Sequence, residues 1–197
     1  RWPGRVAPQT TSEAMVEYVD VLPTFIEAAG GTIPKALEGK SLLPLLAGEV
    51  DHHKKFVFGL MTTRGINAGA PYYGIRSIRS DQYRLIWNLT PEAEFRNVIH
   101  NKEFFLSWKA QAEKGEVEAQ RWVKRYYESP EYELYHSEED PLEVNNLIDD
   151  PSLSGKVEEL KGKLETWMAD QGDLGQETEM AAPSRMVRSL KTPKGKE

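Results

Sequence analysis

Six apolar side chains at helical spacing near the end of the chain place the strongest limit on its fold. They fall four, three, four, three and one residues apart, which puts them on one stripe of a helix: Leu153, Val157, Leu160, Leu164, Trp167 and Met168. Asp150 is expected to cap this helix, Pro151 to take its first position and Gly172 to follow its end. Burying such a stripe is worth on the order of 10 kcal/mol before conformational entropy is subtracted. The helix over 151–171 must therefore dock on another element, most simply a sheet.

The middle of the chain supplies short strands for such a sheet. The segment "FVFGLM", at 56–61, is apolar and aromatic. In "GIRSIRSDQYRLIWNL", at 74–89, Ser80-Asp81-Gln82 reads as a turn between two runs, the second of which alternates as a half-buried strand does. A further short strand is expected at 132–136. These segments predict an antiparallel sheet that contains a hairpin.

Residues 12–29 have the spacing of a helix that begins at Asp20. The Asp20 carboxylate is expected to accept the free amide hydrogens of the first turn, and Pro23 lies where no amide donor is needed. Gly30-Gly31 then ends the helix.

Helical spacing returns at 102–127, in two pieces separated by Gly115. Their aromatic side chains are expected in the core: Phe104, Phe105, Trp108, Trp122 and Tyr126. Beyond Asp173 the chain is polar and aperiodic, which predicts a mobile or surface-wrapping tail over 174–197.

Charge and cysteine content exclude several functions. The chain has 25 Lys and Arg against 31 Asp and Glu, a net charge of −6, so a nucleic-acid partner is not expected. No apolar run approaches the roughly 18 residues of a membrane span. With no Cys, disulfides, thiolate metal sites and a cysteine nucleophile are excluded from this stretch. Because it opens on Arg1-Trp2-Pro3-Gly4, we expect the chain to be a fragment.

Two segments raise the question of a metal site. "ELYHSEEDPLEVNNL", at 133–147, gathers carboxylates around a Pro, but it lacks the alternating oxygen ligands and the Gly of a calcium loop. We interpret it as a strand, a turn at Asp140-Pro141 and two Asn that satisfy free backbone groups. His52-His53 has no third ligand close in sequence, so a solvated loop is expected there.

Four motifs, in order, resemble those of type I sulfatases. The 133–147 stretch resembles the family's Glu-Leu-Tyr-Asp strand and Asp-Pro-x-Glu-x-x-Asn-Leu turn, with His136 where Asp is usual. "VEYVDVLPTFIEAAG" resembles the Val-Asp-Leu-x-Pro-Thr segment, "ALEGKSLLPLLAGE" the Leu-x-Gly-x-Ser-Leu segment, and "RWPG" opens the chain. "YYGIRSIRSDQYRLIWNL" and "WMADQGDLGQETE" are similar to stretches of the bacterial branch near heparan N-sulfatase (N-sulfoglucosamine sulfohydrolase). Gly74 stands where that branch usually has Pro.

The resemblance implies an alkaline-phosphatase-like α/β fold. Residues 1–50 would be the last elements of the large catalytic α/β domain. Residues 51–173 would form the C-terminal α+β subdomain, with a four-stranded antiparallel sheet and a packed C-terminal helix, followed by the polar tail.

The family's chemistry, carried over by resemblance, uses a formylglycine nucleophile and a calcium ion that acts as Lewis acid. The formylglycine motif and the calcium ligands are not in this chain, so we expect no catalytic residue and no metal ligand here, and no hydrolysis by these residues alone. Both would lie in a preceding N-terminal sulfatase domain, the expected partner. The resemblance also implies a periplasmic or extracellular place and a role in glycosaminoglycan degradation, on heparan sulfate or a related polymer.

A loop between strands supplies candidate contacts to the sulfated saccharide. In "MTTRGINAGAPYYGIR", Gly and Pro mark a loop, and forked guanidinium donors suit an anionic sugar. The candidates are Arg64, Asn67, Tyr72, Tyr73 and Arg76. For each the alternative is surface solvation or a structural ion pair.

Three functions are compatible with the sequence. The first is the C-terminal portion of a calcium-dependent sulfatase that hydrolyses sulfate esters or sulfamates of sulfated glycans, such as N-sulfoglucosamine. The second is a non-catalytic glycan-binding or scaffold module derived from such an enzyme. The third is a related alkaline-phosphatase-like phosphoester hydrolase.

Overall fold

The computed structural model describes residues 2–63, 69–70 and 72–185. Two candidate sugar contacts, Arg64 and Asn67, therefore lie outside the described residues. The strands are β1 (Val57–Thr62), β2 (Gly74–Arg79), β3 (Tyr83–Asn88) and β4 (Tyr132–His136). The helices are α1 (Val21–Ala28), α2 (Leu43–Leu46), α3 (Glu103–Glu113), α4 (Val117–Tyr127), α5 (Ser154–Asp170) and α6 (Gln176–Arg185), with short 3₁₀ turns at Tyr18–Asp20, Val98–Asn101 and Pro151–Leu153.

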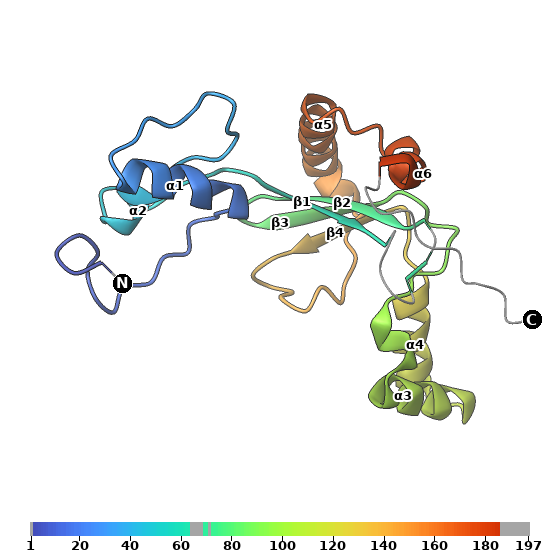
Figure 1. The fold of residues 1–197 in the computed structure, drawn as a ribbon. Coiled ribbons are helices and arrows are strands. Elements are labelled where there is room, and N and C mark those ends of the chain that lie inside the picture. Colours follow the sequence, from blue (N-terminus) through green and yellow to red (C-terminus); the bar gives the residue numbers. More distant parts are fainter. Residues whose placement is uncertain (1, 64–68, 71, 186–197) are drawn as a thin grey trace, which may run out of the picture. The chain divides into compact units, whose positions relative to one another are not determined.

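The sheet is four-stranded and antiparallel, in the order β1-β2-β3-β4, as predicted (Figure 1). Its register follows from the hydrogen bonds at the strand ends. Thr63 N donates to Tyr73 O between β1 and β2, Ser80 N donates to Tyr83 O at the hairpin, and Ser137 N donates to Gln82 O between β4 and β3. The predicted hairpin turn between β2 and β3 is confirmed. Each strand thus pairs with a neighbour that runs in the opposite direction.

The helix predicted over 151–171 ends as its sequence predicts, but its first three residues form a 3₁₀ turn and α5 itself begins at Ser154. The Asp150 carboxylate accepts a hydrogen bond from Ser152 N at 2.9 Å, Pro151 opens the 3₁₀ turn that leads into α5, and Gly172 follows the helix with φ +65°. Four side chains of the predicted stripe are buried: Val157, Leu160, Leu164 and Met168. Lys161 lies 3.7 Å from the ring centroid of Tyr132, so α5 contacts the sheet at β4.

The chain divides into two compact units. The first contains 1–58, 78–84 and 135–145, and the second contains 59–77, 85–134 and 146–197. Helices α1 and α2 belong to the first unit, and the other four helices belong to the second. The predicted division at residue 50 remains a prediction.

Two predictions about the second unit need correction. The segment after Asp173, predicted to be a mobile or surface-wrapping tail, forms α6 up to residue 185 and buries Glu179. Of the aromatic side chains predicted to be core in α3, only Phe105 is buried, while Phe104 and Trp108 are about half exposed. Helices α3 and α4 pack mainly on each other, which leaves the outer face of α3 open. None of the described helices is both long and apolar enough to cross a membrane.

Candidate functional site

A pocket of about 670 Å³ lies in the second unit, beside the predicted sugar-binding loop. Its lining combines small residues with polar side chains: Gly69, Ala70, Ala93, Glu94, Arg96, His100 and Asn101. Gly69 and Ala70 belong to the loop between β1 and β2 that the sequence singled out. The polar residues come from the segment between β3 and α3. The structure thus brings the predicted loop against a second segment that sequence analysis left unassigned.

Local hydrogen bonds shape the far wall of this pocket, which is the wall formed by residues 93–101. Asn97 Oδ1 accepts from Ile99 N at 2.9 Å and from the Tyr126 hydroxyl at 2.8 Å, which fixes the turn before His100. His100 Nδ1 lies 2.8 Å from Asn97 O, so Nδ1 is the protonated nitrogen and donates this bond. The remaining nitrogen, Nε2, is then a hydrogen-bond acceptor when the ring is neutral.

Arg96 and Glu94 are the charged pair of the pocket. The Arg96 guanidinium donates to the Glu94 carboxylate through two nitrogens, and both side chains are about half exposed. The hydrogen bond that Arg96 donates to the Glu94 carboxylate is the main reason that the pKa of Arg96 is raised. With guanidinium, amide and imidazole groups on one wall, the pocket can donate to an anionic group and bond to hydroxyls, as sugar recognition requires.

The predicted contacts Tyr72 and Tyr73 differ in exposure. Tyr72 is partly exposed, and its carbonyl accepts from the Thr90 hydroxyl at 3.2 Å. Tyr73 is fully buried, with its ring 5.3 Å from that of Phe95 in an edge-to-face arrangement. Burial is the main reason that the pKa of the Tyr73 hydroxyl is raised. Of the two, Tyr72 is the one that has surface available for a ligand.

Arg76, the last of the predicted contacts, is buried in an ion-pair cluster. Its Nε lies 2.5 Å from Asp173 Oδ2 and its Nη2 lies 2.9 Å from Glu179 Oε1. Burial by itself would lower the pKa of Arg76 and raise that of Asp173. The hydrogen bonds between them outweigh burial, so the pKa of Arg76 is raised and that of Asp173 is lowered. The described contacts of Arg76 are thus those of a structural ion pair, which was the alternative to contact with the sugar.

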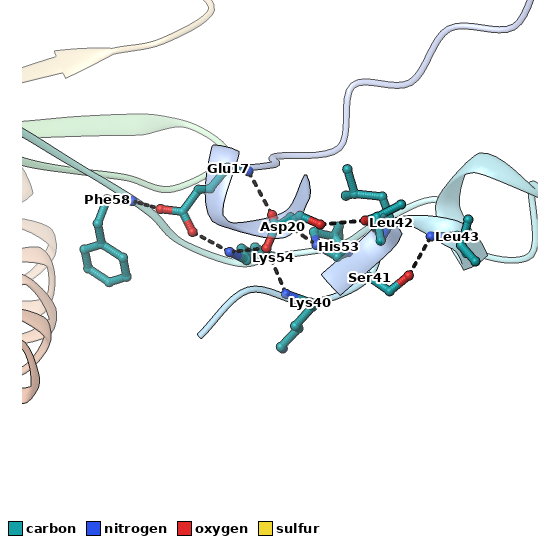
Figure 2. Close-up of polar contacts among 10 residues, drawn as sticks. Glu17, Asp20, Lys40, Ser41, Leu42, Leu43, His53, Lys54 and Phe58 are labelled. Atoms are coloured by element: carbon teal, nitrogen blue, oxygen red, sulfur yellow. Dashed lines mark hydrogen bonds and ion pairs between the residues drawn. The ribbon is translucent and has the colours of Figure 1, made fainter. Parts of the chain in front are cut away.

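A second buried cluster, in the first unit, surrounds Asp20 (Figure 2). The Asp20 carboxylate accepts from Glu17 N and Lys40 N, each at 2.9 Å, and lies 2.8 Å from Lys54 Nζ. Lys54 Nζ is also 2.5 Å from Glu17 Oε2, and the other Glu17 oxygen accepts from Phe58 N at 2.8 Å. Burial opposes the charge of Asp20, but these donors outweigh it, and its pKa is lowered.

This cluster corrects two predictions. Asp20 does precede α1, but its side chain makes no capping bond to the first turn, because the carboxylate is turned to Glu17, Lys40 and Lys54 instead. The His52-His53 pair is not a solvated loop throughout. His52 is exposed, whereas the His53 side chain is buried with Nε2 at 3.3 Å from Asp20 Oδ2.

The acidic stretch folds as the predicted turn. Asp140 accepts from Val144 N at 2.9 Å and from Asn145 N at 2.8 Å, while Asn146 Oδ1 accepts from Leu134 N at 2.9 Å. His136, the departure from the family motif, accepts from Glu139 N at 3.2 Å through Nδ1, as an Asp carboxylate could. Within the described ranges, no three His, Asp or Glu side chains are grouped to hold a metal ion.

Comparison with known proteins decides the family. The family model described as "N-sulphoglucosamine sulphohydrolase, C-terminal" matches residues 1–104, just over half of the chain. This chain belongs to that family.

Individual relatives are sulfatases. An ulvan-active sulfatase of Formosa agariphila is 33% identical over 99% of the chain, and human N-sulphoglucosamine sulphohydrolase is 28% identical over 87%. The solved structure of BT4656 in complex with its substrate, D-glucosamine-2-N,6-O-disulfate, superposes with a TM-score of 0.62 at 22% identity, covering 91% of this chain and 29% of that one. This likeness confirms the alkaline-phosphatase-like sulfatase fold. The chain spans 36% and 38% of the length of the two curated relatives.

Sequence reasoning missed the far wall of the pocket. Arg96, His100 and Asn101 lie between a strand and a helix, where no motif drew attention to them. The available signal was the Asn97 turn, since an Asn that caps a short turn holds the polar residues after it in fixed positions. Which strand loop faces that turn becomes visible only in the folded chain.

Proposed function

We propose that this chain is the C-terminal part of a sulfatase that hydrolyses sulfate esters or sulfamates of sulfated glycans, and that the pocket at Arg96 holds part of the sugar. Membership of the family, with sulfatases among the relatives, carries the reaction class. The substrates named for the relatives, ulvan and a glucosamine disulfate, support a sulfated saccharide, and the second of them supports one of the N-sulfoglucosamine type. Arg96 and Asn101 supply the donors that such a ligand needs.

The catalytic machinery belongs, in this proposal, to a preceding domain. A formylglycine nucleophile and a calcium ion would act there, while this chain binds and orients the saccharide. Helix α1 and the turn before it expose a run of apolar side chains that a larger domain would cover, among them Tyr18 at 96%, Phe25 at 68% and Leu22 at 53% exposure. The 36–38% coverage of the relatives leaves ample length for such a domain.

The pocket is tested by substitution in the full-length protein. Arg96→Ala and Asn101→Ala should each raise KM for a sulfated glucosamine disaccharide, by about tenfold for the arginine, the usual worth of one charge-assisted hydrogen bond. Arg84→Ala is a matched control, because Arg84 is also a partly exposed arginine paired with a glutamate, at 2.8 Å from Glu143, and does not line the pocket. Unchanged KM in the Arg96 and Asn101 variants would refute the pocket.

The reaction class has its own test. Sulfate release from heparan-derived and ulvan-derived oligosaccharides should exceed phosphate release from matching phosphate esters, and the isolated 197-residue chain should release neither. Preferential phosphate release would favour the phosphoester hydrolase, and glycan binding without any turnover by the full-length protein would favour the scaffold module. We also propose a periplasmic or extracellular location, which cell fractionation tests directly.

A further inference from the structure

Helix α6 places one carboxylate, that of Glu179, against strands β1 and β2 of the sheet. Glu179 is buried, with 4% of its surface exposed. Its Oε2 accepts from the Thr62 hydroxyl at 2.5 Å, and its Oε1 accepts from Arg76 Nη2 at 2.9 Å. One side chain thus holds the last residue of β1 and a residue near the start of β2. The loop between these strands supplies Gly69 and Ala70 to the pocket.

Gly74 leaves the space that Glu179 occupies. A Cβ added at Gly74 would lie 2.5 Å from Glu179 Cγ and 2.8 Å from Cδ, which no ordinary packing allows. Gly74 is not among the residues with positive φ, so the requirement is for space rather than for a special backbone conformation. Glu179 can therefore lie against β2 only because residue 74 has no side chain.

Ion pairing alone does not call for Glu179. Arg76 is already paired with Asp173 through Nε, and Asp173 is buried beside it. A second carboxylate gives the cluster one positive and two negative charges, and a buried surplus charge is unfavourable unless other groups stabilise it. What Glu179 adds is the bond to Thr62, which ties α6 to the end of β1.

Hydrogen bonds lead from that strand end to the wall of the pocket. Thr63, next to Thr62 and 1% exposed, donates through its hydroxyl to Ala70 O at 2.8 Å and through its amide to Tyr73 O at 3.2 Å. Ala70 N in turn donates to Arg96 O at 3.3 Å. Both walls of the pocket, the Ala70 side and the Arg96 side, are therefore joined to the strand end that Glu179 holds.

We propose that Glu179 is a positioning residue for saccharide binding: through Thr62 it sets the placement of the Ala70 and Arg96 walls. This inference rests on the proposed function of the pocket. A displaced wall weakens every contact to the sugar, because hydrogen bonds lose strength steeply with distance and angle. Glu179 itself touches no substrate in this account.

Steady-state kinetics of the full-length protein on a sulfated disaccharide test the proposal. Glu179→Ala should raise KM about tenfold with kcat within about twofold, since misplacement of binding groups is felt first in affinity when the chemistry is done elsewhere. Glu179→Gln can accept from Arg76 through its oxygen and donate to the Thr62 hydroxyl through its NH₂ group, so it keeps the link to Thr62 and should restore most of the affinity. Thr62→Val should raise KM as Glu179→Ala does, and the two substitutions together should add little to either alone. Glu177→Ala, on the exposed face of the same helix, is the matched control and should leave KM unchanged.

Amide hydrogen exchange gives a readout that does not depend on turnover. In Glu179→Ala and in Thr62→Val, the amides of Thr63 and Ala70 should exchange faster, while those of the β3–β4 pair should not change. If Glu179→Ala does not fold, Glu179→Gln and Thr62→Val decide the question. Unchanged KM and unchanged exchange in folded Thr62→Val would overturn the inference. If Arg96→Ala raises KM but the Glu179 and Thr62 variants do not, only the inference fails; if Arg96→Ala has no effect, the proposed pocket fails.

Discussion

The two buried ion-pair clusters, one in each unit, are built around opposite charges. In the first unit the centre is a carboxylate, Asp20, which accepts from two backbone amides and lies beside Lys54. In the second unit the centre is a cation, Arg76, with the carboxylates of Asp173 and Glu179 around it. The first cluster joins the turn before α1 to the segments that carry Lys40 and Lys54. The second attaches the C-terminal segment to the sheet.

The difference predicts unequal sensitivity to substitution. When Asp20 loses its charge, Lys54 keeps Glu17 as a partner. Two buried carboxylates that lose Arg76 repel each other and have no second cation among their described contacts. A guanidinium also bonds both carboxylates through separate nitrogens, which an ammonium group does with less directional control.

The largest effect is expected from Arg76→Met. It fills a similar volume but leaves Asp173 and Glu179 unpaired, and breaking a buried pair in this way costs about 3–5 kcal/mol. Urea denaturation of the full-length protein measures the loss in the free energy of unfolding. Arg76→Lys should fall between wild type and Arg76→Met. A loss below that of the Asp20 variant would reverse the proposed order of the two clusters.

Asp20→Asn should destabilise the protein less, by about 2–4 kcal/mol, because the amide can accept from only one side while its NH₂ group faces other donors. The matched comparison is Asp51→Asn, at an exposed carboxylate that pairs with His52 and should matter little. The same urea titration reports both. A loss for Asp20→Asn as small as that for Asp51→Asn would mean that the Asp20 cluster contributes no stability.

Acid should weaken the clusters through Asp20 and Asp173. The pKa of each is lowered by its donors, so the folded state holds the ionised form more tightly than the unfolded chain does. Their contribution is therefore present above the unfolded pKa of about 3.9 and is lost as the pH falls through the lower folded value. Wild type should lose stability steeply below about pH 4, and Asp20→Asn should show a shallower slope there. Equal slopes in a pH series of urea titrations would contradict this role for Asp20.

The two clusters also show how far the sequence could be read. The sheet, the hairpin at Ser80–Gln82 and the ends of α5 followed from local patterns, since turns and caps are decided by residues a few positions apart. Only part of the Asp20 cluster could be predicted. The sequence singled out Asp20, but its partner Lys40 is 20 positions away and Lys54 lies further on. For Arg76 the partners are 97 and 103 residues away, so the sequence left substrate contact and a structural ion pair as equal alternatives. The pocket has the same limit, because its walls come from separate loops.

Gly74→Ala should sharpen the account of the second cluster. The new Cβ would collide with Glu179, and overpacking of this kind costs about 1–3 kcal/mol. In a Glu179→Ala background the collision disappears, so Gly74→Ala should then be nearly neutral. A double-mutant cycle in urea isolates this coupling. Equal costs in both backgrounds would show that Gly74 is required for some other reason.

The smallest effect is expected at the partly exposed pair of Arg84 and Glu143. This pair separates burial from pairing as the source of the strength of the clusters. Their distance of 2.8 Å is as short as that between Lys54 and Asp20, but both side chains are about a third exposed. Water screens the attraction, so Glu143→Gln should change the free energy of unfolding by no more than about 1 kcal/mol. Added salt should remove even that difference, whereas it should leave the cost of Arg76→Met largely intact. A loss for Glu143→Gln comparable to that for Asp20→Asn would mean that short distance alone, without burial, gives these pairs their strength.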